Sequence, residues 1–227
     1  MKSSKGKTIA VSVKSRGTTG SASKEKIFAS AKKLFADKGF RNVSVREIAS
    51  DAGVNSALVG YHFGGKQKLF DEVYRSYAEP LAKERMNALL ALTNKNKTPS
   101  TEEILKAWLL PWLKVKDKAN QNSLYVHFTA HVSAERWKQK RKANSFSLRT
   151  HAAFIKAFEQ CLPHLSRDTL TWRLHFIVGA IAFGLQDPNS LKAFSNGRCD
   201  SADLKTTFAQ ILAFALEGLS GPEPKEN

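Results

Sequence analysis

The sequence predicts an all-α protein. Apolar residues recur along most of the chain at intervals of three and four, the spacing that places them on one face of a helix. No stretch shows the sustained alternation of apolar and polar residues that is typical of a half-buried strand. Only 13 Gly and 7 Pro occur in 227 residues, which argues against a turn-rich all-β design.

The composition favours a partner that carries phosphate. The chain holds 36 Lys and Arg against 20 Asp and Glu, a formal charge of +16, and such a field attracts nucleic acid, anionic membrane surfaces and acidic ligands. Two cysteines, Cys161 and Cys199, cannot form a disulfide framework and indicate a reducing, cytoplasmic setting. The longest apolar run, residues 174–185, is too short to span a membrane, so we expect a soluble protein.

Residues 1–22 predict a flexible basic arm, because they hold five basic residues, no acid and much Ser, Thr and Gly. Helical periodicity begins at Ser23, and Gly39 ends this first helix. Residues 1–78 carry 15 basic and six acidic side chains, which makes this third of the chain the most basic per residue. The expected domains are 23–68 and 69–227.

Glycines divide the next segment into short helices. The second starts at Ser44, whose hydroxyl can cap the N–H of Glu47 while Glu47 reaches back, and it ends at Gly53. A third runs from about residue 55 to 63, before Gly64 and Gly65. A long helix then covers residues 66–92, with Pro80 as a kink or boundary inside it.

The rest of the chain predicts five further helices. They lie near residues 101–116, 122–142, 147–161, 168–185 and 202–219. Residues 94–100 and 186–200 are expected to be loops, since both are rich in Pro, Gly, Asn, Asp or Ser.

The spacing inside the second and third helices predicts a helix-turn-helix. Two helices that cross steeply need a small residue, a Gly four positions later that can adopt positive φ, and apolar residues directly after it and five positions beyond. The residues at these positions, and those filling the inner face, are Ala49, Gly53, Val54 and Val59, with Ile48 and Ala52. An ordinary helical hairpin is the alternative interpretation.

Three strings extend this pattern: Val43-Ser44-Val45-Arg46-Glu47-Ile48-Ala49, Ala52-Gly53-Val54-Asn55 and Tyr61-His62-Phe63-Gly64-Gly65-Lys66. Together they resemble the N-terminal domain of the TetR/AcrR family of bacterial transcriptional regulators. The resemblance covers residues 24 to about 75. It implies an N-terminal helix-turn-helix DNA-binding domain and a larger C-terminal helical domain that binds a ligand and dimerises.

In a helix-turn-helix the second helix enters the major groove with its N-terminal end toward the bases. The expected DNA-binding residues are Ser44, Arg46, Asn55, Ser56, Ala57, Gly60, Tyr61, His62 and Lys66. Asn55 and Ser56 either read a base or cap the helix, and His62 either packs or binds. Many relatives carry Tyr or Asn where this chain has Gly60, so operator affinity is expected to depend more on phosphate contacts and on the arm. The arm either lies in the minor groove or remains a disordered tail.

A dimer is expected because one small helix-turn-helix gives little specificity, whereas a two-fold pair of them reads a palindrome. The last two long helices are the expected interface, the first apolar nearly all round and the second with a broad apolar stripe. The interface residues are Trp172, His175, Phe176, Gly179, Ala182, Phe183, Phe208, Ile211, Leu212 and Ala215. Alternatively, these helices form only the core of the domain.

The central helices are rich in aromatic residues, which line ligand pockets as well as cores. The expected effector pocket consists of Trp108, Trp112, Tyr125, Phe128, His131, Phe154 and Phe158. Residues 114–149 are strongly basic. This basic run either forms a solvated face or attracts an effector that is both apolar and anionic.

The sequence thus predicts a ligand-responsive transcriptional regulator, most simply a repressor, that binds a palindromic double-stranded DNA operator as a homodimer and is released by a small-molecule effector. His127 and His131, spaced i and i+4, leave open a metal-sensing regulator. A sequence-indifferent basic DNA-binding protein is the other alternative. No reactive constellation or phosphate-binding loop is present, so neither an enzyme nor a cofactor is expected.

Overall fold

The computed structural model describes residues 16–94, 98–114, 145–186, 188–201 and 203–224, and within these ranges it contains helices and no strand. The helices are α1 (Arg16–Lys38), α2 (Val45–Asp51), α3 (Ala57–Phe63), α4 (Lys66–Thr93), α5 (Thr101–Lys114), α7 (Ser145–Cys161), α8 (Arg167–Gln186), α9 (Pro188–Phe194) and α10 (Leu204–Ser220). The all-α prediction is confirmed. No helix in these ranges is long and apolar enough to cross a membrane.

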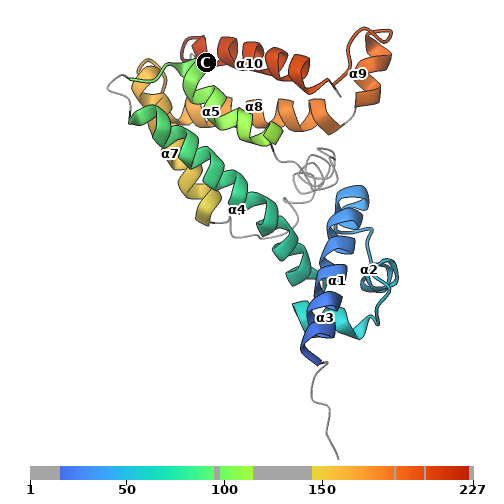
Figure 1. Ribbon diagram of the computed structural model, residues 1–227. Helices are drawn as coiled ribbons and strands as arrows, with labels where there is room; N and C mark the ends of the chain where they lie inside the picture. The colour runs from blue at the N-terminus through green and yellow to red at the C-terminus, as the bar shows by residue number, and fades with distance from the viewer. Residues whose placement is uncertain (1–15, 95–97, 115–144, 187, 202, 225–227) are drawn as a thin grey trace, which may run out of the picture.

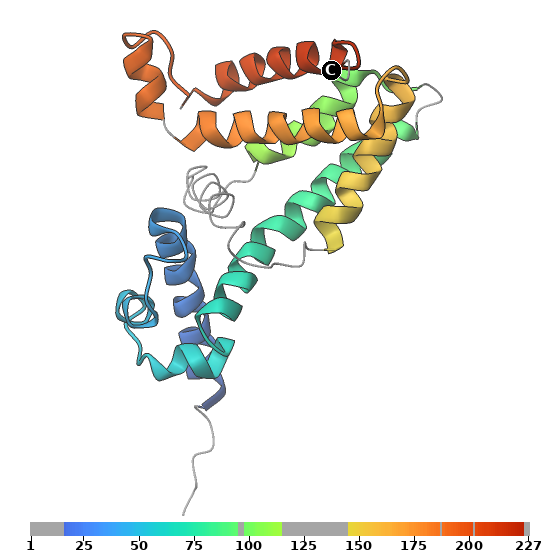
Figure 2. The same ribbon diagram turned by 180° about the vertical axis from the view of Figure 1, so that it is seen from behind.

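Two hydrophobic cores lie at opposite ends of α4 (Figures 1 and 2). The N-terminal core joins α1, α2 and α3 to the first half of α4, down to Leu81. The C-terminal core begins at Leu89 and joins the end of α4 to α5, α7, α8 and α10. In both views α8 and α10 run side by side at the end of the molecule away from α1–α3. The helix α4 is therefore the covalent and packing link between the two ends.

Local sequence signals account for the N-terminal helices. Gly39 has φ of 74° and ends α1, with its N–H bonded to the Phe35 carbonyl at 3.1 Å. The capping box of α2 is confirmed, because the Ser44 hydroxyl accepts from Glu47 N and the Glu47 carboxylate accepts from Ser44 N. The expected start of the first helix was wrong, since residues 16–22 are already helical. Ser21 donates to Glu25 one turn on, at 3.1 Å, which supports this extra turn.

The helix α4 continues through Pro80, so this residue is not a boundary. Pro80 has no N–H to give to the Ser76 carbonyl, which costs the helix one hydrogen bond. The surrounding turns are held by packing: Tyr77, Leu81 and Ala82 are at least 94% buried. Tertiary contacts thus outweigh the local preference of proline to end a helix.

One helix was not expected. Residues 188–194 form α9 inside the predicted loop 186–200. Pro188 occupies its first position, where a missing N–H costs nothing and the fixed φ suits a helix. The expected helix 122–142 lies outside the described residues.

Gly53 and Gly60 form a matched pair for a test of stability. Gly53 has φ of 64°, whereas Gly60 lies within α3, and a Cβ at either would meet nothing within 4 Å. We expect Gly53→Ala to lower the free energy of unfolding by about 1 kcal/mol. A Cβ fits the space at this position, so the cost comes only from placing alanine in the left-handed backbone conformation. Gly60→Ala should raise it by up to ~1 kcal/mol through helix propensity. Thermal denaturation without DNA measures both, and equal shifts would contradict the assignment.

Candidate nucleic-acid interface

The α2–α3 unit has the geometry of a helix-turn-helix. The turn is closed by hydrogen bonds from Gly53 N to the Ser50 carbonyl (3.1 Å) and from Val54 N to the Ala49 carbonyl (2.9 Å). Ala49 is 2% exposed and Val59 is fully buried, so the two helices meet closely. The positive φ of Gly53 and the buried positions agree with the spacing argument. The two helices and their turn therefore form one tightly packed unit with the geometry that the helix-turn-helix prediction requires.

The outer face of α3 consists of small residues and one large aromatic ring. Ser56, Ala57 and Gly60 are exposed, and Tyr61 is 82% exposed, while Phe63 points into the core. Small side chains let the helix axis approach a groove closely. The exposed phenol group of Tyr61 is a hydrogen-bond donor free to reach outward.

Two of the expected DNA-binding residues act as caps in the free protein. The Asn55 side-chain oxygen accepts from Ala57 N at 2.9 Å, and the Ser44 hydroxyl oxygen accepts from Glu47 N at 3.1 Å. Ser56 makes no side-chain cap hydrogen bond. Capping leaves the Asn55 amide N–H₂ group and the Ser44 hydroxyl proton as donors toward DNA.

His62 and Lys66 flank the end of α3. His62 is partly buried, its ring lies 5.0 Å from that of Tyr61, and its Nε2 atom has no hydrogen-bond partner in the described structure. The Lys66 ammonium lies 4.3 Å from the centre of the Phe40 ring. Gly65, with φ of 112°, precedes α4 and supplies no side-chain cap, and a helix N-terminus of this kind can bind an anion.

The structure adds basic and polar residues that the sequence argument missed. Arg41, Gln67 and Lys68 are exposed at the ends of the helix-turn-helix. Lys24, on α1, places its ammonium 5.5 Å from the Phe63 ring, beside the end of α3. The Lys66-Gln67-Lys68 run in the first turn of α4 was the available signal. Arg46, which was expected, is also exposed.

Other lysines of this region bind acids of the same chain. Lys38 pairs with Glu47 at 2.7 Å and Lys33 with Asp51 at 3.1 Å, both between α1 and α2. These pairs fasten α1 across α2, and Ser30 adds a buried hydrogen bond to the Ile48 carbonyl at 3.1 Å. Some basic residues of the N-terminal third are therefore engaged by acids of the same chain.

Glu47 gives this fastening a pH dependence. The hydrogen bond from Lys38 and that from Ser44 N lower the pKa of Glu47 below its ordinary value. A carboxylate with a lowered pKa in the folded state contributes stability above its unfolded pKa, and this is lost as pH falls through the folded value. We expect Glu47→Gln to flatten the fall in thermal stability on acidification below about pH 4.5. An unchanged pH profile would contradict the role of this carboxylate.

Most residues expected to form a dimer interface lie on the surface of α8. Trp172 is 62% exposed, Phe176 61% and Phe183 73%, and Gly179 lies on the same side. Their spacing of four, three and four residues places them along one helix face. The rings of Trp172 and Phe176 stack, with centres 5.6 Å apart. His175 is exposed beside them, and the side chain of Ala182 lies outside the described residues.

On α10 the expected stripe faces the C-terminal core. Phe208, Ile211 and Leu212 are partly buried against that core, and Ala215 is fully buried. Ala215 is therefore a core residue and not a surface residue, because the stripe of α10 is what packs against α5 and α8. Phe214, 62% exposed on the outer side, was missed.

Three residues of the expected effector pocket belong to the C-terminal core. Trp108 is 3% exposed, and Phe154 and Phe158 are fully buried. Arg85 fixes this region by donating from Nε to the Trp108 carbonyl at 2.8 Å. The side chain of Trp112, and Tyr125, Phe128 and His131, lie outside the described residues, as does His127. No group of three or more metal-ligating side chains occurs among the residues that are described.

Comparison with known proteins agrees with this geometry. The family described as bacterial regulatory proteins of the tetR family matches residues 27–73. The family described as a tetracyclin repressor-like C-terminal domain matches residues 106–218. The two matches correspond to the two ends of the molecule joined by α4.

Two relatives are described as HTH-type transcriptional regulators. The HTH-type transcriptional regulator BetI of Brucella melitensis biotype 2 is 26% identical over 208 residues, which cover 86% of this chain and 90% of the relative. The probable HTH-type transcriptional regulator YttP of Bacillus subtilis is 34% identical over 106 residues, 47% of this chain and 49% of YttP. The match to YttP thus spans about half the length of that relative.

Solved structures share the fold. The probable transcriptional regulatory protein RHA5900 aligns with a TM-score of 0.56 and 19% identity, covering 88% of this chain and all of the other. A mutant of HlyIIR with a GSSGSSG linker aligns with a TM-score of 0.51 and 23% identity, covering 92% of this chain and 99% of the other. The arrangement of the helices in this chain is therefore shared with these two solved structures.

Proposed function

Since the chain belongs to the TetR family of bacterial transcriptional regulators, we propose that it is a ligand-responsive repressor that binds a palindromic operator as a homodimer. Residues 23–68 read DNA, and residues 69–227 dimerise and hold the effector. The observation that carries this proposal is the outer face of α3, where small exposed residues and Tyr61 lie on a rigid helix-turn-helix. The protein acts in the cytoplasm, the compartment that contains the operator DNA.

The proposed contacts with DNA divide into two kinds. Asn55, Ser56, Ala57 and Gly60 approach base edges at the N-terminal end of α3. Ser44, Arg46, Tyr61 and Lys66 hold phosphates on either side, and His62 packs beside Tyr61 with its Nε2 atom buried. Such phosphate contacts position the helix without reading sequence, whereas contacts to base edges specify it. Because the reading residues are small, phosphate contacts contribute a large share of the affinity and make it dependent on salt.

The proposed dimer is formed by the exposed face of α8. Trp172, Phe176 and Phe183 expose large apolar rings on one side of that helix, which isolated proteins rarely leave in water. Phe214 is a further exposed aromatic residue, on the neighbouring helix α10. A two-fold axis here pairs α8 and α10 of each subunit as a four-helix bundle.

Ligand response is proposed as a shift between two populations of the dimer. An effector that binds better to one spacing of the two reading heads favours that spacing. If the favoured spacing no longer matches successive major grooves, operator affinity falls. The helix α4 supports this coupling, because its two ends belong to the two cores.

Selection of genomic DNA fragments by the purified protein, at two salt concentrations, tests this function. The proposal expects a shared palindrome whose half-sites lie about one helical turn apart and which is retained at the higher salt. Fragments retained only at low salt, with no shared sequence, would contradict it and indicate binding by charge alone.

A further inference from the structure

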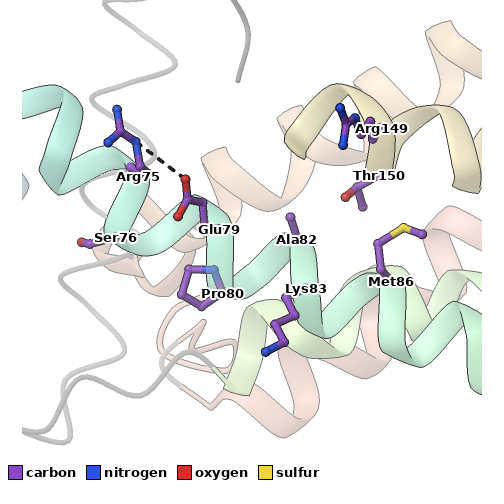
Figure 3. A pocket seen from close by; sticks show the side chains of 9 residues that line it. All are labelled: Arg75, Ser76, Glu79, Pro80, Ala82, Lys83, Met86, Arg149 and Thr150. Carbon is purple, nitrogen blue, oxygen red and sulfur yellow. Dashed lines mark ion pairs between the residues drawn. The ribbon is translucent and has the colours of Figure 1, made fainter. Parts of the chain in front are cut away.

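A cavity of about 750 Å³ opens between α4 and α7. Its volume lies within the ~300–1,000 Å³ of pockets that hold small organic ligands. The described lining residues, shown in Figure 3, are Arg75, Ser76, Glu79, Pro80, Ala82, Lys83, Met86, Arg149 and Thr150. Of the aromatic residues expected to form the effector pocket, Trp108, Phe154 and Phe158 are not among the described lining residues.

The cavity lies along α4 at the boundary between the two hydrophobic cores. Its α4 lining runs from Arg75 to Met86, whereas the N-terminal core ends at Leu81 and the C-terminal core starts at Leu89. This stretch includes Pro80, which leaves the Ser76 carbonyl without its helical donor. A molecule bound here contacts the part of α4 that connects the DNA-reading end to the rest of the chain.

The described lining carries three basic side chains and one acidic one. The acid, Glu79, already pairs with Arg75, with Oε1 and Nε 3.7 Å apart. Arg149 is exposed and has no ion pair within the described part of the chain. The charge left to attract a ligand is therefore positive.

The side chains are arranged as an apolar surface with a cation beside it. Figure 3 shows Arg149 and Thr150 of α7 across from Ala82 and Met86 of α4, while the Lys83 ammonium points away from them. Ala82 is 5% exposed and Thr150 is 4% exposed, so each presents only a small part of its surface to the cavity that it lines. The Thr150 hydroxyl adds one polar group to this wall.

We propose that this cavity binds a small amphiphilic anion, with its anionic head at Arg149 and its apolar body against Ala82, Met86 and Thr150. The head is a carboxylate or a phosphate, which a guanidinium binds in the same bidentate way. The inference rests on the proposed function for its effect on DNA binding, but the binding itself is measured without DNA.

Calorimetric titration of the full chain tests the ligand class with four probes of one chain length: decanoate, decyl phosphate, decanol and decylammonium, each below its aggregation concentration. We expect at least one of the two anions to bind about tenfold or more tightly than decanol and decylammonium. Which anion binds better identifies the head group. Equal or tighter binding of the alcohol or the ammonium, or no binding of either anion, overturns the proposal.

Variants of two lining residues have opposite expected effects. Arg149→Gln removes the anchoring cation and should weaken binding of the preferred anion about tenfold. Glu79→Gln removes the acid and releases Arg75, so it should tighten binding. Lys156→Gln, an exposed change on the same helix outside the lining, is the matched control. Lys83→Gln should weaken binding less than Arg149→Gln, because the Lys83 ammonium points away from Arg149 and Thr150 (Figure 3). A cation site would show the reverse signs for Glu79→Gln and Arg149→Gln.

A DNA-binding measurement with the preferred anion then separates this inference from the proposed function. We expect the anion to lower operator affinity in the unsubstituted protein and to lower it less in Arg149→Gln. If the anion binds with the expected signs but leaves operator affinity unchanged, the site holds and the ligand-responsive function is contradicted. If another small molecule releases the operator while no anion binds here, the function holds and this site is contradicted.

Discussion

Replacing Phe176 by glutamate is expected to raise the dissociation constant of the dimer about 100-fold or more. Aromatic residues at the centre of an interface commonly contribute more than ~2 kcal/mol each, and the substitution places two carboxylates near the two-fold axis. Phe176 is 61% exposed in the single chain, so the fold does not depend on it. Loss of the dimer should also remove specific DNA binding, because each half-site alone gives little affinity.

Sedimentation over a range of protein concentrations measures this effect. Leu148→Glu is the control, since Leu148 is a similarly exposed apolar residue (56%) that lies on α7 and not on α8 or α10. The control should remain dimeric. A Phe176→Glu protein that dimerises as tightly as the unsubstituted chain would show that this face of α8 is not the interface.

Replacing Ala57 by glutamate is expected to lower operator affinity about 100-fold with the fold intact. Ala57 is exposed at the first position of α3, where a carboxylate suits the helix N-terminus. The same carboxylate would enter the major groove between two rows of phosphates, where like charges repel. Affinity for DNA should therefore fall while thermal stability stays the same or rises.

The measurement pairs titration of a selected operator fragment at one fixed salt concentration with a thermal melt. Ala152→Glu, an exposed alanine on α7, adds the same charge away from α3 and should change the affinity by less than the α3 variant. Equal losses in the two variants would indicate an effect of net charge and not of position. Unchanged binding by Ala57→Glu would remove the N-terminal end of α3 from the interface.

The N-terminal domain was predictable because short-range rules decide its geometry. The Ser44 and Glu47 capping box and the positive φ of Gly53 are properties of a few adjacent residues, and both occur in the structure. The start of α1 was placed too late because Ser, Thr and Gly in residues 16–22 have low helix propensity. Pro80 was read as a break because its local preference was weighed without the packing of Tyr77 and Leu81.

The C-terminal domain was less predictable because its surfaces depend on packing between distant helices. Periodicity identified the apolar stripe of α10, but not that Ala215 is buried in the C-terminal core while Phe214 is exposed. The α4–α7 cavity joins Arg149 to residues more than sixty positions earlier, and no local pattern connects them. The basic residues were visible in the sequence, whereas their partners, such as Glu79 for Arg75, were not.

A hydroxyl-radical footprint of the protein on a selected operator shows whether two copies of α3 read DNA on a two-fold axis. We expect two protected segments related by a dyad, with centres about one helical turn apart on one face of the duplex. Uniform protection along the fragment, or a single protected segment without a symmetric partner, would contradict a dimeric reader.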